Sequence, residues 1–324
     1  MRLMVTGATA PFGTALVERL LTEPDVELVL AVGRESQTRW HDPRVAYRET
    51  DLTRPRDVHD LVCGAAREHA IDTVVHAAQH RDAHGHGRRV HAQNVESARS
   101  LVLGCTGHPT IRRFVYRSFA EVYAQHHATT SVLDEDALLE FDPTIPQWLR
   151  DRVEADLTVC SHNGGPLHII VLRCAELLSS GTGSQLWDYL SSRVCLRPAG
   201  FDPIINVLAI EDAVSAFIAA ARSTAIGVFN IPGADTLPLS RAIAESNCVD
   251  IAVPGALMSP LYKLRRAVAG YDFRYDLNVR RFHFGGVLDG SRARRELGYV
   301  PSARVLWPRP WWRVLFERLA EMRS

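Results

Sequence analysis

The stretch Met4-Val-Thr-Gly-Ala-Thr-Ala-Pro-Phe-Gly13 decides the fold of this chain. It closes a short apolar run, Leu3 to Val5, and opens a stretch of helical character. A strand, a glycine turn and a helix N-terminus in this order present backbone N–H groups and the helix dipole to an anion, and glycine lets the backbone approach it closely. The spacing of Gly7 and Gly13 is typical of a dinucleotide-binding fingerprint, whose middle glycine is replaced by Ala10.

Composition and charge argue against several classes of protein. The chain has 324 residues, of which 46% are hydrophobic and 23% charged, the balance of an ordinary globular protein. Its formal net charge is +0, which gives no electrostatic case for a nucleic acid or an anionic membrane as partner. The first apolar run breaks at Thr6, too early for a signal peptide or a membrane span. The six cysteines have no paired spacing, so we expect reduced thiols in the cytoplasm and no zinc site.

Apolar, strand-like runs alternate with helical stretches through the first half of the chain. This order predicts an α/β fold with a doubly wound parallel sheet of the Rossmann type. The expected strands span residues 3–5, 26–32, 44–47, 71–76, 113–116, 167–172 and 228–231, and the main expected helices span 12–21, 53–69, 90–105, 147–161, 210–221, 240–246 and 292–297. Ligands bind beyond the carboxyl ends of such strands, so we expect these segments to face the site: 6–13, 33–36, 51–53, 76–86, 117–127 and 173–184.

An ordered set of motifs runs along nearly the whole chain. The motifs are Thr6 to Gly13, Asp51-Leu52, His76-Ala-Ala78, Asn94-Val95, Arg113 to Tyr123, Val171-Leu-Arg173, Ile210 to Ala213, Val228 to Ile231 and Ser291 to Pro301. In order and spacing the set resembles the extended short-chain dehydrogenase/reductases, the nucleotide-sugar epimerase and dehydratase-like proteins.

The resemblance implies two functional parts and a small-molecule substrate. Residues 1–173, completed by about 204–232, would form a Rossmann domain that binds NAD or NADP. Residues 174–203 and 233–307 would form a smaller α/β part that closes over the substrate. Residues 308–324 read as an amphipathic C-terminal helix, whose apolar stripe is typical of packing against its own body. We also leave a homodimer open.

The resemblance also implies a set of cofactor-binding residues: Gly7, Thr9, Ala10, Phe12, Gly13, Arg34, Asp51, Leu52, Ala77, Ala78 and Arg152. Asp51 matches the residue that contacts the adenine, although an aspartate there also suits a helix cap. Gly33-Arg34 stands where an acidic residue would bind the ribose 2′-hydroxyl. An arginine there can pair with a 2′-phosphate, which favours NADP over NAD, and a solvated arginine is the alternative.

The residues that carry the family's chemistry are replaced. The resemblance implies a Ser or Thr, and a Tyr and a Lys four residues apart on one helix face. Matching the motifs puts Phe119 at the first position, Trp148 at the second and Arg152 at the third. A second observation does not depend on this alignment. Lys263 is the only lysine and Ser259 stands four residues before it, so the chain contains no Tyr-x-x-x-Lys pair.

Loop residues after the fifth and sixth strands are candidates to replace this chemistry. Glu121 lies two residues after Phe119, and Glu176 matches a substrate-contacting position in Leu172-Arg-Cys-Ala-Glu176. Two carboxylates in one pocket can act as acid and base if burial separates their pKa values. The alternative for each is a solvated or ion-paired carboxylate.

Histidines gather after the fourth strand. His76 at the strand end suits packing beneath the cofactor, whereas His80 lies where the resemblance puts substrate contacts and is the third acid/base candidate. His84-Gly-His86 lacks a third ligand at a recognisable spacing, so we predict a solvated loop and no metal. The pair His126-His127 lies further along a later loop and could reach the mouth of the pocket.

Three functions remain open from the sequence. The favoured one is an atypical enzyme that uses the pocket carboxylates or histidine for a dehydration, cyclisation or isomerisation, with the cofactor structural or absent. The second is an NADP-dependent reductase or epimerase with a relocated proton donor. The third is a catalytically silent dinucleotide-binding regulator. A chain with one lysine suggests a GC-rich genome, which makes a natural-product substrate the preferred expectation.

Overall fold

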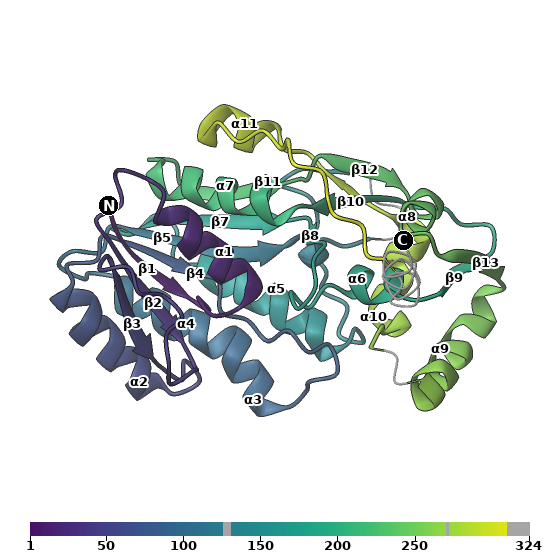
Figure 1. Ribbon diagram of the computed structural model, residues 1–324, viewed down its shortest axis with the longest axis horizontal. Helices are drawn as coiled ribbons and strands as arrows, with labels where there is room; N and C mark the ends of the chain where they lie inside the picture. The colour runs from purple at the N-terminus through teal and green to yellow at the C-terminus, as the bar shows by residue number, and fades with distance from the viewer. Residues whose placement is uncertain (126–130, 270–271, 310–324) are drawn as a thin grey trace, which may run out of the picture.

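The structure is a computed structural model that describes residues 1–125, 131–269 and 272–309 (Figure 1). The expected C-terminal helix falls almost wholly outside these residues, and so do His126 and His127. None of the helices among the described residues is long and apolar enough to cross a bilayer.

Seven parallel strands form the main sheet, in the order β11-β7-β5-β4-β1-β2-β3. The strands are β1 Arg2–Thr6, β2 Leu28–Gly33, β3 Val45–Glu49, β4 Thr73–His76, β5 Arg113–Phe119, β7 His168–Cys174 and β11 Gly227–Ile231. The chain starts in the middle of the sheet and the strand order reverses between β1 and β4. Such a reversal opens a ligand crevice at the carboxyl ends of the strands. The predicted fold class, a doubly wound Rossmann-type sheet with a smaller C-terminal part, is confirmed.

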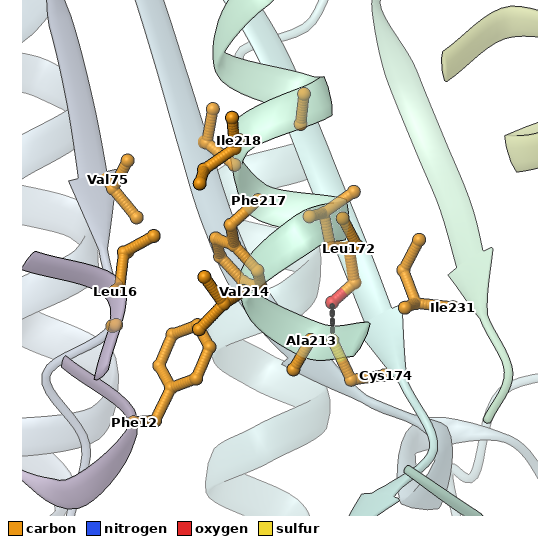
Figure 2. Packing of buried hydrophobic residues seen from close by; sticks show 14 of the residues in the cluster. Phe12, Leu16, Val75, Leu172, Cys174, Ala213, Val214, Phe217, Ile218 and Ile231 are labelled. Carbon is orange, nitrogen blue, oxygen red and sulfur yellow. Dashed lines mark hydrogen bonds between the residues drawn. The ribbon is translucent and has the colours of Figure 1, made fainter. Parts of the chain in front are cut away.

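Helices cover both faces of this sheet because alternate strand residues point to opposite sides. Leu3 and Val5 of β1 belong to the core with α1 (Pro11–Leu20) and α7 (Ile210–Arg222). Met4 belongs to the opposite core with α2 (Pro55–Asp60), η1 (Leu61–Ala66), α4 (Ser97–Cys105) and α5 (Gln147–Cys160). Figure 2 shows Phe217 of α7 next to Phe12 of α1, and their ring centroids lie 4.9 Å apart, edge to face.

The remaining strands form three small sheets. The first has the order β12-β10-β8, with β8 Glu176–Leu177, β10 Ile204–Leu208 and β12 Asp235–Pro238; β13 (Val249–Val253) pairs with β9 (Val194–Pro198), and β14 (Val287–Leu288) with β6 (Val132–Leu133). The remaining helices are α3 Arg88–His91, η2 Ala92–Glu96, η3 Ala120–Val122, α6 Gln185–Leu190, α8 Leu239–Glu245, α9 Gly255–Ala269, α10 Tyr275–Phe284 and α11 Ser291–Leu297. Aromatic rings fill the core of this part, among them Tyr189, Tyr262, Phe273 and Phe282. The domain boundaries given above stay a prediction.

A buried ion pair ties the end of the sheet to α5. The Arg173 guanidinium on β7 donates to both oxygens of Asp156 on α5, at 3.1 and 2.7 Å, and both side chains are almost fully buried. Ser118 on β5 donates to the same carboxylate at 2.5 Å. Because α5 also carries Trp148 and Arg152, this pair fixes the helix that faces the end of β5.

We predict that Asp156→Asn lowers the free energy of unfolding by roughly 3–5 kcal/mol, because it leaves the Arg173 cation buried without a counter-charge. Urea unfolding followed by circular dichroism measures the change. Arg241→Ala is the control, since Arg241 pairs with Glu245 at an exposed i,i+4 position and should cost less than about 0.5 kcal/mol. If both variants lost the same free energy of unfolding, the buried pair would stabilise the fold no more than an exposed ion pair does.

Candidate functional site

One cavity of about 760 Å³ opens at the carboxyl ends of the main strands. It runs from the loop after β1, past the ends of β2 and β5, to the loop before α6. Ten of the eleven predicted cofactor residues line it: Gly7, Thr9, Ala10, Phe12, Gly13, Arg34, Leu52, Ala77, Ala78 and Arg152. Asp51, the eleventh, borders a smaller neighbouring cavity together with Arg34.

The loop after β1 has the close packing that a phosphate cradle requires. Gly7 has a φ of +69°, and a Cβ there would lie 2.8 Å from the Cα of Ala78; a Cβ on Gly13 would lie 2.1 Å from the carbonyl oxygen of Gly7. Ala10 has a φ of −74°, which any residue adopts, so the missing middle glycine does not strain the turn. The N-terminus of α1 has no acidic residue in its first turn and no side-chain cap among the described residues. It is therefore open to an anion, and the cradle fits a pyrophosphate.

The loop after β4 is fixed against this cradle through Thr6. The Thr6 hydroxyl accepts hydrogen bonds from the backbone N–H groups of Ala77 and Ala78, at 3.2 and 3.3 Å, and lies 2.7 Å from Nδ1 of His76. Burial lowers the pKa of His76 to about 3, so the ring is neutral at pH 7. His76 therefore packs between strands as a structural group.

The end of β2 carries an acidic residue that the sequence analysis missed. Glu35 lines the cavity, and its carboxylate accepts the backbone N–H of Arg34 at 3.0 Å. Burial raises the pKa of Glu35, but hydrogen bonds from Thr9 and from the backbone outweigh burial and hold it below its ordinary value. The Arg34 guanidinium instead pairs with Asp51 at 3.1 Å. The sequence did contain a signal for Glu35, since it is an acidic residue only two positions after Gly33 at the end of the strand.

The three positions matched to the family's chemistry meet in space. Arg152 lies against two aromatic rings, with its guanidinium carbon 3.6 Å from the centroid of Phe119 and 4.2 Å from that of Trp148. It also pairs with Glu121 at 3.0 Å. Burial lowers the pKa of Arg152, and the Glu121 carboxylate opposes that shift. Phe119 and Arg152 line the cavity, whereas Trp148 is buried against Ala83.

Only one of the three predicted acid/base candidates lines the cavity. His80 does so, and its Nε2 is buried beneath Gly85 without a hydrogen-bond partner among the described residues. Glu121 does not line the cavity; one of its oxygens pairs with Arg152, and the other is buried without a partner in the same set of residues. Both oxygens of Glu176 are occupied. One accepts the Ser184 hydroxyl at 2.5 Å and the backbone N–H at the start of α6, and the other pairs with Arg281.

A further titratable group was not singled out from the sequence. Asp188 on α6 lines the cavity and accepts the Gln185 amide at 3.2 Å. Burial, and then the charge of Asp272 on the same wall, raise the pKa of Asp188 to about 6. The sequence offered no signal for it, since Asp188 lies on a short helix that was not predicted. None of the described tyrosines lines the cavity, and the described residues contain no group of three metal-ligating side chains.

The loop that carries His80 is bonded to residues of two distant segments of the chain, around residues 181 and 272–274. Arg81 donates to the carbonyl oxygen of Gly181 at 2.6 Å, and Nε2 of His84 lies 3.0 Å from the carbonyl oxygen of Asp272. Arg274 donates to the carbonyl oxygen of Ala83 at 2.7 Å. Contacts between segments far apart in the sequence therefore hold together the part of the cavity wall that the His80 loop forms.

Several solved structures share this fold. WbmG of Bordetella bronchiseptica, in complex with NAD, superposes with a TM-score of 0.69 at 16% identity and covers 94% of this chain and 90% of that one. UDP-glucuronic acid 4-epimerase of Bacillus cereus, in complex with UDP-glucuronic acid and NAD, gives a TM-score of 0.69 at 16% identity, with coverage of 94% and 95%.

Sequence relatives extend the comparison. Uncharacterised proteins of Mycobacterium bovis and Mycobacterium tuberculosis are 28% identical over 309 residues, which is 92% of this chain and 80% of theirs. A 3-diazoavenalumate denitrifying reductase of a Streptomyces species is 29% identical over 199 residues, 59% of this chain and 61% of that protein. The family model that matches residues 3–231 takes in the whole parallel sheet and the cradle, and on that ground the chain belongs to the NAD dependent epimerase/dehydratase family.

Proposed function

We propose that this protein is a dinucleotide-binding enzyme that acts on a small molecule of specialised metabolism by acid/base chemistry. The reaction class is a dehydration, cyclisation or isomerisation. The observation that carries the proposal is the lining of the cavity, which leads from an intact phosphate cradle to His80 and Asp188. No tyrosine of the described residues reaches that lining, so a proton must move through other groups.

The chain's own residues bind the dinucleotide at one end of the cavity. Gly7, Gly13 and the N-terminus of α1 receive the pyrophosphate, and the Glu35 carboxylate is placed to accept a ribose hydroxyl. A nicotinamide dinucleotide supplies a hydride donor or acceptor when bound. Because Glu35 is anionic and the Arg34 guanidinium is engaged by Asp51, we propose NAD as the ligand, in place of the NADP that Arg34 alone suggested.

His80 and Asp188 divide the proton transfers in this proposal. A carboxyl with a pKa of about 6 is largely ionised at pH 7 yet basic enough to take a proton from carbon, so Asp188 is assigned as the base. His80 is assigned as the acid that protonates a leaving hydroxyl as water, or returns a proton in an isomerisation. Glu121 neutralises Arg152, and Glu176 anchors α6 and Arg281, so we give both a positioning role.

A reductase with a relocated proton donor is the second candidate. It is favoured by the Streptomyces relative, whose name describes a reductase. In this alternative His80 or Asp188 supplies the proton that accompanies the hydride. A loss of nicotinamide absorbance on addition of substrate would favour the reductase, whereas product formation without net change in that absorbance favours acid/base chemistry.

We predict that Glu35→Gln shifts the preference from NAD toward NADP by about tenfold in the ratio of dissociation constants, roughly 1.4 kcal/mol, because it removes a negative charge that repels a 2′-phosphate. Titration calorimetry with NAD and NADP measures the ratio. Glu49→Gln is the matched control, since Glu49 lies near Arg34 but outside the main cavity. An unchanged ratio in Glu35→Gln would remove the argument for NAD.

We predict that His80→Gln and Asp188→Asn each lower turnover by about 10²–10⁴-fold, because each removes a proton-transfer group. The readout is complementation of a deletion strain, followed by untargeted mass spectrometry of the culture. The compound that accumulates should exceed the lost product by one water for a dehydration and equal it in mass for a cyclisation or isomerisation. A difference of two hydrogens would identify a redox enzyme.

Exposed residues provide the controls for that experiment. His41→Gln and Asp136→Asn make the same chemical changes on the surface and should complement fully. If His80→Gln and Asp188→Asn also complement fully while the deletion has a phenotype, the acid/base assignment is wrong. If the deletion accumulates nothing although the pure protein binds NAD, a silent dinucleotide-binding regulator is the better description.

We predict that Asp188→Asn raises the melting temperature by about 2–4 °C at pH 8 and leaves it unchanged at pH 4. The folded carboxyl has a pKa of about 6 against an ordinary 3.8, so the folded state holds this proton more tightly than the unfolded state. The contribution of Asp188 to the free energy of unfolding is therefore fully present below pH 3.8 and is lost as the pH rises through 6. The side-chain amide in Asp188→Asn does not ionise, so the variant does not lose this contribution. Calorimetric scans at both pH values measure it. If the melting temperature of Asp188→Asn differed from that of wild-type protein by the same amount at both pH values, the raised pKa of Asp188 would be contradicted.

A further inference from the structure

Arg117 is a buried cation that lines the cavity and has no directly bonded carboxylate among the described residues. It lies on β5, is 8% exposed and lines the cavity. Its guanidinium carbon lies 4.9 Å from the ring centroid of Phe12 and 5.4 Å from that of Phe119. No hydrogen bond or ion pair joins the guanidinium to any other described residue.

Other buried arginines around the site have oxygen partners. Arg152 pairs with Glu121, Arg281 pairs with Glu176, and Arg173 forms the two-point contact with Asp156. The chain thus pairs each of these three guanidinium groups directly with a carboxylate, whereas Arg117 has no such direct pair among the described residues.

An unpaired guanidinium in this position is costly. Burial lowers the pKa of Arg117 and the charge of Arg152 lowers it further, whereas Cys174 and the more distant Glu121 carboxylate, which is paired with Arg152, oppose the shift. The Cys174 thiol is no counter-ion at pH 7, because burial raises its own pKa to about 12. Arginine keeps its proton even so, and contact with aromatic faces offsets only part of the lost hydration. An anion in the cavity would complete the compensation.

The surroundings of Arg117 add to the positive potential. Phe12, which its guanidinium faces, lies in the first turn of α1, where the helix dipole is positive and no acidic residue stands. Arg152 also lies against Phe119, but Glu121 pairs with it, so the end of α1 is the feature that adds to the charge of Arg117. The side chain and the helix end are independent features that both favour an anion at this end of the cavity.

We propose that Arg117 is a binding residue for an oxyanion, a carboxylate or phosphate, in the cavity. The planar fork of a guanidinium pairs with two oxygens of such a group at once, which an ammonium cannot do. Two sources share this chemistry: the pyrophosphate of the dinucleotide, and an acidic group of the small-molecule substrate. The inference needs only the cavity and the buried cation, so it stands or falls independently of the acid/base roles of His80 and Asp188.

The test compares wild-type protein with Arg117→Met, which keeps the length of the side chain and removes the charge. Titration calorimetry is run at constant ionic strength with three probes: inorganic pyrophosphate, NAD, and benzoate added to NAD-saturated protein. Arg67→Met is the control, because Arg67 is an exposed arginine outside the cavity, and we expect less than a twofold change from it.

The outcomes separate the two sources. If the pyrophosphate is the anion, Arg117→Met weakens pyrophosphate and NAD binding by about tenfold or more. If the anion belongs to the substrate, NAD binding is unchanged, and benzoate binds to NAD-saturated wild-type protein but not to the variant. The proposal would be overturned if all three probes bound equally well to wild-type protein and to Arg117→Met, or if Arg67→Met weakened their binding as much as Arg117→Met does.

A second variant guards against misfolding. Arg117→Lys keeps the charge but loses the two-point contact, so it should weaken the same probe severalfold and restore part of what Arg117→Met loses. Arg117→Met should also melt at a higher temperature than wild-type protein in the absence of anions, because it removes an uncompensated buried charge. A lysine variant that binds every probe as tightly as wild-type protein would contradict recognition by the guanidinium fork.

Discussion

The ion pair between Arg173 and Asp156 is the constraint on which the geometry of the site depends. It joins β7 to α5, and Ser118 adds β5 to the same carboxylate. Because strand residues alternate, anchoring Ser118 on this side turns Arg117 and Phe119 toward the cavity. Arg152 lies one helical turn before Asp156, so the same anchor sets the distance between Arg152 and Phe119.

Charged groups in the cavity lining are of two kinds. Two cations that line the cavity are matched by carboxylates: Arg34 pairs with Asp51, and Arg152 with Glu121. Two other groups in the lining have no directly bonded counter-charge: Arg117 contacts the rings of Phe12 and Phe119, and Asp188 lies near Asp272. Unmatched charges cost stability, and ligand recognition and proton transfer are the uses that such groups serve. The cavity is therefore a part of the molecule where unmatched charge lowers the stability of the fold.

The sequence predicted the sheet and the cradle well because both rest on local signals. Alternating apolar runs and the glycine spacing around Gly7 and Gly13 are readable from neighbouring residues, and the segments after the strands do line the cavity. Asp188 was missed because its short helix is placed by contacts with distant residues. Glu176 was expected in the pocket, but its carboxylate is taken up by the start of α6 and by Arg281, which no local pattern reveals.

The contacts that hold the loop around His80 affect the rate at which a ligand can enter or leave the cavity. Residues 81, 83 and 84 are bonded to Gly181, Arg274 and Asp272, and the latter two come from the far end of the chain. A ligand too large to pass beneath this loop can enter or leave only when these contacts open together. Exchange of such a ligand would then be slow and governed by the opening of the loop, so that these contacts set its dwell time.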